Sequence, residues 1–195
     1  MSISITLHRS GTSRTQQVDT TTTGLDLFGS DRAVVAMRVD GNLVDLQREL
    51  HDGAEVEPVE ATSEDGLNII RHSATHVMAQ AVQQLYPEVN LGIGPFITDG
   101  FYYDFGNIEP VTPEVLSELE KRMKRIVKEN QRFVRRVTTE ESAREELADQ
   151  PYKLELIGTK GKGAEGASVE VGGGELTIYD NVRRNGEVAW KDLCR

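Results

Sequence analysis

The sequence predicts an α+β protein of two small domains, and three features carry that prediction. Polar and apolar residues alternate over residues 3–7, the two-residue period of a half-buried strand. Apolar residues recur at helical spacing over 67–86. Asp40-Gly41 separates two apolar runs, which favours a hairpin because both residues of such a turn must tolerate positive φ. The 195 residues suffice for two small cores.

The first domain is predicted to hold five short strands and one short helix. The strands are expected at 3–7, 15–20, 33–39, 42–46 and 55–59, with the helix within 23–28. This order of elements is that of a ubiquitin-like β-grasp module. Residues 62–66 read as a linker or helix start, so we place the first domain at 1–62 and the second at 63–195.

The second domain is predicted to be α+β. A helix over 67–86 ends at Pro87, because proline cannot continue it. Thr112-Pro113 is typical of a helix start, and Thr138-x-x-Glu141 has the form of a capping box that opens a short helix. The remaining predicted elements are two strands within 92–105, strands at 131–137, 176–180 and 187–190, and a strand-like segment after Lys153. The seven glycines from 158 to 174 indicate a flexible loop.

The buried stripe of the helix that opens at Pro113 is predicted from its apolar spacing. Its expected members are Leu116, Leu119, Met123, Ile126 and Val127. The same segment starts a strongly basic run, since residues 121–136 hold eight basic residues and one acid. That run is either a solvated helix face or a local phosphate-contacting patch. The candidates for phosphate contact are Lys121, Arg122, Lys124, Arg125 and Lys128.

Composition excludes several classes of protein. A net charge of −10 argues against a protein that coats nucleic acid by bulk electrostatics. The longest apolar run, 33–37, is far shorter than the roughly 20 residues of a membrane helix. No membrane partner is therefore expected, and the cytoplasm is the default location. One cysteine cannot form an internal disulfide, so packing and hydrogen bonds must hold the fold.

His72 and His76 are the most suggestive pair of side chains for chemistry. Four residues apart on a helix, they lie on one side about a turn apart, as paired metal ligands or proton-transfer groups do. They lie opposite the apolar stripe, beside Ala79, where a cavity could form. Two solvated or hydrogen-bonded histidines remain the alternative. No glutamate lies between them, which disfavours the metalloprotease helix.

Three further residues could join the histidines. Asp192 and Cys194 would share one face of a terminal strand, since side chains alternate along strands. Taken alone, Cys194 would more often be inert than reactive, and Lys153 would be read as an ordinary surface lysine.

At this point four ordered blocks resemble one family. The blocks IIRHSATHVMAQAV (69–82), GPFITDGFYYDF (94–105) and WKDLCR (190–195) are similar to the N-terminal region of threonyl-tRNA synthetases. The block AMRVDGNLVDL (36–46) resembles the TGS β-grasp domain that precedes that region. The resemblance covers essentially the whole chain. It implies a TGS domain followed by an editing domain of the threonyl/alanyl-tRNA synthetase second-additional-domain type.

The resemblance implies hydrolytic editing of seryl-tRNA(Thr), with the acceptor end of that tRNA as partner. By position in the matching blocks, the resemblance places six residues at the editing site. Our hypothesis is that His72 and Lys153 position and activate water. The other four would hold the serine moiety and the terminal adenosine, namely His76, Tyr103, Asp192 and Cys194. No cofactor is implied for editing, and His72, His76 and Cys194 would be the ligands if zinc were bound. ATP and zinc are expected only for an aminoacylation domain, which this sequence lacks. A homodimer is expected of the full-length protein, through domains that are also absent from this sequence.

The sequence departs from the family pattern in one place. The family continues as C-x-x-x-H, whereas this chain stops at Arg195, so the editing domain is expected to be cut just before its last motif histidine. Two alternatives stay open. One is a free-standing deacylase that acts in trans, and the other is a non-catalytic, zinc-stabilised RNA-binding module.

Overall fold

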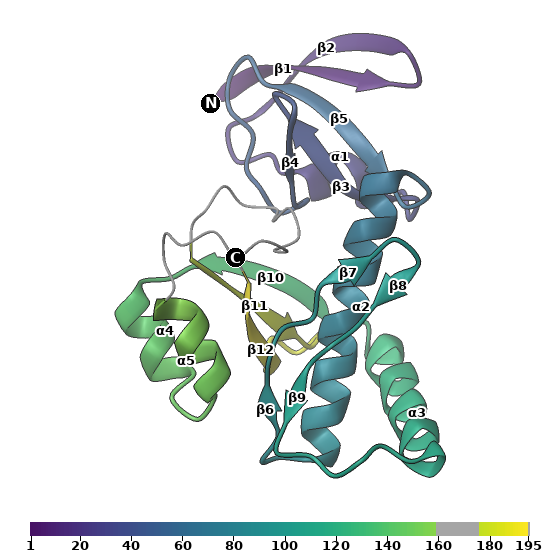
Figure 1. Cartoon of the computed structure of the whole chain (residues 1–195). Helices are drawn as coiled ribbons and strands as arrows, with labels where there is room; N and C mark the ends of the chain where they lie inside the picture. Colours follow the sequence, from purple (N-terminus) through teal and green to yellow (C-terminus); the bar gives the residue numbers. More distant parts are fainter. Residues whose placement is uncertain (159–175, 195) are drawn as a thin grey trace. The chain divides into compact units, whose positions relative to one another are not determined.

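The computed structural model describes residues 1–158 and 176–194, and the chain has the predicted mixed α+β structure (Figure 1). It divides into two compact units, Met1–Ile70 and Arg71–Arg195. The division lies inside helix α2 (Glu64–Leu85), and the predicted boundary after residue 62 lies just before that helix. No helix in the described part of the chain is long and apolar enough to cross a membrane.

The first unit contains one five-stranded sheet and one short helix, α1 (Gly24–Phe28). Its strands are β1 (Ser2–Arg9), β2 (Thr12–Asp19), β3 (Val34–Val39), β4 (Asn42–Val44) and β5 (Glu55–Glu60). The strand order is β2-β1-β5-β3-β4. Strands β1 and β5 are parallel and the other neighbours antiparallel. Each element predicted for this part of the sequence is present.

Local sequence explains why these strands form. In β1 the alternation buries Ile3 and Ile5, which pack with Phe28 of α1 in the core of the unit. Between β3 and β4, Asp40 has φ +51° and Gly41 φ +79°. Positive φ at both central residues matches the twist of a two-residue hairpin, so the predicted turn is confirmed. The core of this unit is complete without residues from the second.

The second unit is built around the sheet β10 (Arg132–Val137), β11 (Thr177–Val182) and β12 (Val188–Cys194). All neighbours are antiparallel in the order β10-β11-β12, which leaves β12 at an edge. The helices are α2, α3 (Pro113–Glu129), α4 (Glu140–Glu146) and α5 (Pro151–Gly158). Two small ribbons pair β6 (Asn90–Leu91) with β9 (Phe105–Gly106), and β7 (Phe96–Ile97) with β8 (Gly100–Phe101).

The three-stranded sheet separates two layers of helices, as Figure 1 shows with α4 and α5 on one side and α2 on the other. Trp190 of β12 joins the core that includes residues of α2 and α3. Leu193 of the same strand joins the core formed with α4 and α5. These residues are three apart, so strand alternation sends them to opposite faces. Because the rings of His76 and Trp190 lie 5.5 Å apart, helix α2 has the sheet on its histidine side.

Three local expectations are corrected. The segment after Lys153 is helical, since α5 starts at Pro151 and continues to Gly158. The run from 153 to 157 alternates like a strand, and a short apolar run cannot be assigned by periodicity alone. Helix α4 is capped by Thr139, whose hydroxyl accepts from the Ser142 N–H, and not by Thr138. In α3 only part of the predicted stripe is covered, because Leu116 and Val127 are exposed.

Candidate functional site

The two histidines of α2 are in direct contact. Their Nε2 atoms lie 3.1 Å apart, within hydrogen-bond distance, and their ring centroids are 4.9 Å apart. Such a bond needs one ring to donate and the other to accept. When both rings are neutral, one carries its proton on Nε2 and the other on Nδ1. The spacing of four residues therefore brings both rings to one side of the helix, as predicted, and the bond between them agrees with the alternative of two hydrogen-bonded histidines as well.

His76 is the buried member of the pair, with only 4% of its surface exposed. Its ring meets Phe133, Tyr179 and Trp190 edge to face, at centroid distances of 5.5 to 6.1 Å. Burial lowers the pKa of His76 to about 3, against the opposing effect of the Asp192 carboxylate. The side of α2 opposite the apolar stripe is thus covered by the sheet rather than open to solvent.

His72 lies one turn earlier and is only partly buried. Burial also lowers its pKa, and Lys153 adds to that effect while Asp192 opposes it. Both histidines are therefore neutral at neutral pH. A neutral imidazole at a partly open position can accept a proton, as general-base chemistry requires. The influence of Asp192 and Lys153 on both rings places all four groups in one electrostatic neighbourhood.

Tyr103, Lys153 and Asp192 form a closed triangle beside the histidines. Lys153 Nζ lies 2.7 Å from Asp192 Oδ1, and both side chains are almost fully buried. The Tyr103 hydroxyl donates to Asp192 Oδ2 at 3.0 Å and accepts from Lys153 Nζ at 3.4 Å. Asp192 Oδ1 also accepts the Leu193 N–H. A buried carboxylate with both oxygens engaged holds the lysine in a single position.

Lys153 owes its position to the start of α5. Just before this helix, Gln150 is buried and accepts the Leu91 N–H at 2.8 Å through its side chain. The same side chain donates to the Val89 carbonyl at 3.3 Å. These two bonds join the start of α5 to the β6 segment. Helical geometry then directs the Lys153 side chain toward Asp192 on the edge strand β12. The strand predicted for this segment would not have implied that direction.

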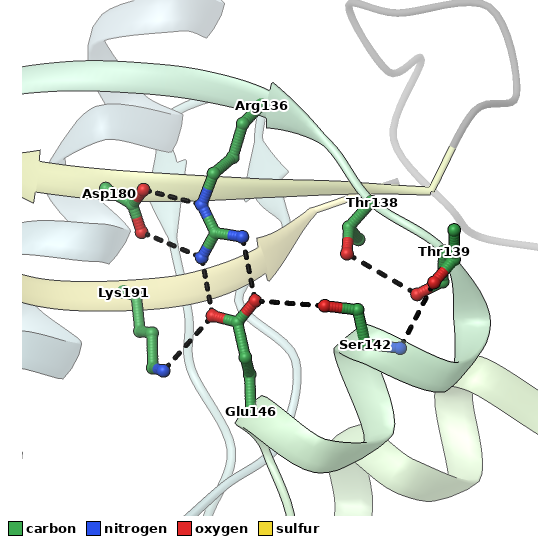
Figure 2. A network of polar contacts seen from close by, with 7 residues as sticks. All are labelled: Arg136, Thr138, Thr139, Ser142, Glu146, Asp180 and Lys191. Carbon is green, nitrogen blue, oxygen red and sulfur yellow. Dashed lines mark hydrogen bonds and ion pairs between the residues drawn. The ribbon is translucent and has the colours of Figure 1, made fainter.

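The opposite face of the sheet carries a separate polar network (Figure 2). Arg136 of β10 makes two bonds to Glu146 of α4, at 2.8 and 2.6 Å, and two to Asp180 of β11. Lys191 of β12 adds an ion pair to Glu146 at 3.2 Å. These hydrogen bonds, chiefly that from Arg136, lower the pKa of Glu146 to about 2. The network ties α4 to all three strands.

A pocket of about 800 Å³ runs along the edge of β12. Its lining includes Arg136, Glu146 and Asp180 of the Arg136 network, and also Lys153 and Asp192. The Lys153–Asp192 ion pair therefore lines a space that solvent can enter, whereas His72 and His76 are not among the residues that line it.

The position of Cys194 is described only for its backbone, which pairs with Thr177 at the end of β12. Its side chain and Arg195 lie outside the described residues, so the predicted approach of the thiol to the histidines stays a prediction. The predicted loop at 158–174 lies outside them from residue 159 on. Among the described residues no group of three His, Cys, Asp or Glu side chains is arranged to hold a metal ion.

The basic run is divided between two roles. Arg122 and Lys124 form ion pairs within α3, with Glu118 at 3.0 Å and Glu120 at 2.6 Å. The other predicted phosphate contacts are exposed and have no ion pair within the described residues, namely Lys121, Arg125 and Lys128. Because these three are spaced i, i+4 and i+7, they form one stripe along the helix.

Sequence reasoning missed the polar residues that support the site. Gln150 is one, and Gln80 of α2 is another, since its side-chain oxygen accepts from buried Asn181 of β11 at 2.8 Å. The Gln83 side chain accepts the Trp190 indole N–H at 2.7 Å. Gln80 and Gln83 lie one and two turns after His76, so polar residues continue along the histidine side of α2. That continued polarity was the available signal that this side meets hydrogen-bonding groups of the sheet.

Comparison with known proteins gives one consistent result. No protein-family profile matches the chain. A threonine–tRNA ligase of Streptomyces avermitilis is 59% identical over 196 aligned residues, which cover 99% of this chain and 30% of that protein. Those of Streptomyces griseus and Streptomyces coelicolor are 62% and 56% identical, over 91% and 99% of this chain. The chain is therefore related over nearly its whole length to the threonine–tRNA ligases, and it spans about 30% of the length of the curated relatives it matches.

Proposed function

We propose that the second unit hydrolyses the ester bond of seryl-tRNA(Thr), as the editing part of a threonine–tRNA ligase. One observation carries the proposal: the histidine pair His72 and His76 forms one cluster with three residues distant in sequence, namely Tyr103, Lys153 and Asp192. Four segments contribute to it, namely α2, the stretch before β9, α5 and β12. The relationship to threonine–tRNA ligases supports the choice of substrate.

The chemistry of the two amino acids explains why such an activity is needed. Serine lacks one methyl group of threonine, and a pocket shaped for the larger residue gains only about 1 to 3 kcal/mol against the smaller one. A synthetic site has no steric means to reject the smaller amino acid. A second site that admits serine and excludes threonine would supply the missing discrimination by hydrolysis.

In the proposed reaction, water attacks the carbonyl carbon of the ester between serine and the terminal ribose. The neutral imidazole of His72 takes a proton from that water. Lys153, held by Asp192, positions the water through its ammonium group. The ester C–O bond then breaks, the ribose oxygen takes up a proton, and serine and tRNA leave. Tyr103 and Cys194 are assigned to the serine moiety and the terminal adenosine.

His76 is assigned a role through its neighbour. Its burial and its bond to His72 favour orientation of the His72 ring over the direct substrate contact expected from the sequence. A base with a fixed ring loses less entropy in reaching the geometry for proton transfer. Asp192 likewise acts mainly through Lys153, because both of its oxygens are already engaged.

Replacement of His72 by alanine tests the proposal. We expect H72A to lower the rate of seryl-tRNA hydrolysis by about 10²- to 10⁴-fold, the usual contribution of a general base. The measurement is release of serine from seryl-tRNA(Thr), corrected for spontaneous hydrolysis, with threonyl-tRNA as the unreactive comparison. H51A is the matched control, because His51 is an exposed histidine of the first unit. Equal rates for wild type and H72A would remove His72 from the mechanism.

The first unit is proposed to be a β-grasp domain of the TGS type. Its strand order, with β1 and β5 central and parallel and a helix between β2 and β3, supports that assignment. Its proposed role is that of a docking or tRNA-contacting appendage, and the alternative role is that of a structural spacer.

The exposed stripe of the second unit is proposed to contact tRNA phosphates, through Lys121, Arg125 and Lys128. We also propose that the protein is located in the cytoplasm and that the full-length protein is a homodimer.

Editing is proposed to proceed without a metal ion or other cofactor. Metal analysis beside the hydrolysis assay separates this from the zinc-stabilised RNA-binding module. Hydrolysis by metal-free protein supports editing. One equivalent of zinc without hydrolysis supports the module, with His72, His76 and Cys194 as its ligands. ATP is expected only where an aminoacylation domain is present.

A further inference from the structure

Tyr103 provides the hydroxyl that joins Lys153 and Asp192, so its ring must be accurately placed. One side of the ring stacks on Phe105, with centroids 4.7 Å apart and planes within 14°. The segment that precedes β7 lies against another part of the ring. A side chain built on Gly94 would place its Cβ 2.2 Å from Tyr103 Cδ2 and 2.6 Å from Cε2. No real Cβ approaches so closely, so only glycine fits the observed ring position.

The backbone on both sides of this contact is fixed by hydrogen bonds. The Gly92 N–H donates to the Asp104 carbonyl, and the Asp104 N–H donates to the Ile93 carbonyl, both at 2.9 Å. These bonds continue the pairing of β6 with β9 and bring Gly94 against Tyr103. The two segments cannot move apart without breaking them. A side chain at 94 would therefore displace the aromatic ring rather than the backbone.

We propose that Gly94 is a positioning residue for the hydrolytic site, which holds the Tyr103 hydroxyl on Lys153 and Asp192 by leaving room for its ring. This inference rests on the proposed function. Alanine at 94 would move the ring by about 1.2 Å, the difference between 2.2 Å and the 3.4 Å of ordinary contact. Asp192 Oδ2 would then lose the hydroxyl as donor, and Lys153 would lose it as acceptor.

The consequence should appear in kcat, in addition to any change in KM from the lost contact between Tyr103 and the substrate. A misplacement of about 1 Å can cost about 10²-fold in rate. We therefore expect G94A to lower kcat for seryl-tRNA hydrolysis by about 10²-fold. G100A is the matched control, because a Cβ on Gly100 in the adjacent hairpin meets no atom within 4 Å. Its kcat should equal that of wild type.

A cycle of variants separates positioning from general damage to the fold. In the Y103F background the ring still clashes with the methyl group that G94A adds, but there is no hydroxyl to misplace. G94A should then lower the melting temperature without a further loss of kcat. In the Y103A background the clash is gone, and G94A should change neither quantity. An equal loss of kcat from G94A in all three backgrounds would mean that the new methyl group acts elsewhere, for example on the substrate, and would overturn the proposal.

A second readout keeps the inference distinct from the proposed function. Stacking on Phe105 shifts the NMR resonances of the Tyr103 ring protons, and G94A should change those shifts because the displaced ring lies differently on Phe105. If wild-type protein does not hydrolyse seryl-tRNA, the proposed function fails while this shift still decides whether Gly94 places the ring. Unchanged Tyr103 resonances in folded G94A protein would overturn the role of Gly94.

Discussion

At the scale of single residues, the site depends on how burial changes the charge of its histidines. His76 is enclosed by three aromatic rings, and burial lowers its pKa to about 3. Such a ring cannot act as a base for external substrate at neutral pH, but it can hold a neighbour in place. His72, which is more open, keeps a lowered pKa and a lone pair suited to proton transfer. The proposed function thus gives the same residue type two roles, decided by position.

Burial of His76 also predicts how stability depends on pH. The unfolded chain protonates this ring near pH 6.5, whereas the folded protein does so only near pH 3. The folded state binds fewer protons in that window. The contribution of His76 to the unfolding free energy is therefore fully present above pH 6.5 and is lost as pH falls toward 3. Because glutamine does not titrate there, H76Q should lose less. The slopes of unfolding free energy against pH should differ by up to about 1.4 kcal/mol per pH unit.

Urea denaturation of both proteins between about pH 7 and about pH 5 measures that difference. This range lies above the titration of Glu146, whose pKa is lowered. Glutamine can keep a polar atom near the position of the imidazole Nε2, so the bond to His72 can be retained. Parallel curves for wild type and H76Q would contradict the assigned burial effect.

At the scale of elements, the attachments of helices α4 and α5 position Lys153. Arg136 and Glu146 fix α4 to the sheet (Figure 2). Gln150 fixes the start of α5 to the β6 segment. Lys153 lies within one helical turn after Gln150. The placement of this buried lysine therefore depends on two polar contacts of its neighbouring helix and loop, in addition to its own pair with Asp192.

Removal of the Glu146 charge tests the attachment of α4. E146Q keeps the shape of the side chain but leaves Arg136 with Asp180 alone and Lys191 with a neutral partner. We expect a loss of about 1 kcal/mol in unfolding free energy, since these groups are partly exposed and screened by solvent. The carboxylate contributes above its ordinary pKa of 4.5 and loses that contribution as pH falls toward 2, so the loss should diminish in acid.

E140Q supplies the comparison on the same helix. Glu140 pairs with Arg144 at 2.9 Å, and both side chains are more exposed than the Glu146 network. An exposed i, i+4 pair is worth about 0.3 to 0.5 kcal/mol. Denaturation of the two variants side by side, at neutral pH and low salt, gives the difference. Equal losses would mean that the network contributes no more than an ordinary surface ion pair.

At the scale of the whole molecule, the chain has two units with separate cores. Ile5 and Met37 are fully buried in the first, and Ile178 is fully buried between the sheet and α4–α5 in the second. The candidate site lies wholly within the second unit. Helix α2 belongs to both, with its histidines after the division at residue 70. Stability of the first unit and hydrolysis by the second should therefore be separable.

Two cavity-forming variants test that separation. I5A and I178A each remove buried methyl groups and should each cost about 2 to 5 kcal/mol in their own unit. Calorimetry with hydrogen exchange should show that I5A weakens protection in residues 1–70 and leaves the rate of seryl-tRNA hydrolysis unchanged. I178A should weaken protection in the second unit and reduce the temperature at which hydrolysis is lost. An equal loss of protection in both units from I5A would show one cooperative fold instead.

Sequence alone determined the elements whose signals are local. The alternation in β1, the Asp40-Gly41 turn, the Thr112 cap and the histidine spacing depend on neighbouring residues, and all were found as predicted. Tertiary structure decided the rest, because each remaining feature joins residues far apart in the chain. It made the segment after Lys153 a helix, buried His76 against the sheet, and brought Lys153 and Tyr103 to Asp192. Periodicity within a short segment carries no information about such partners.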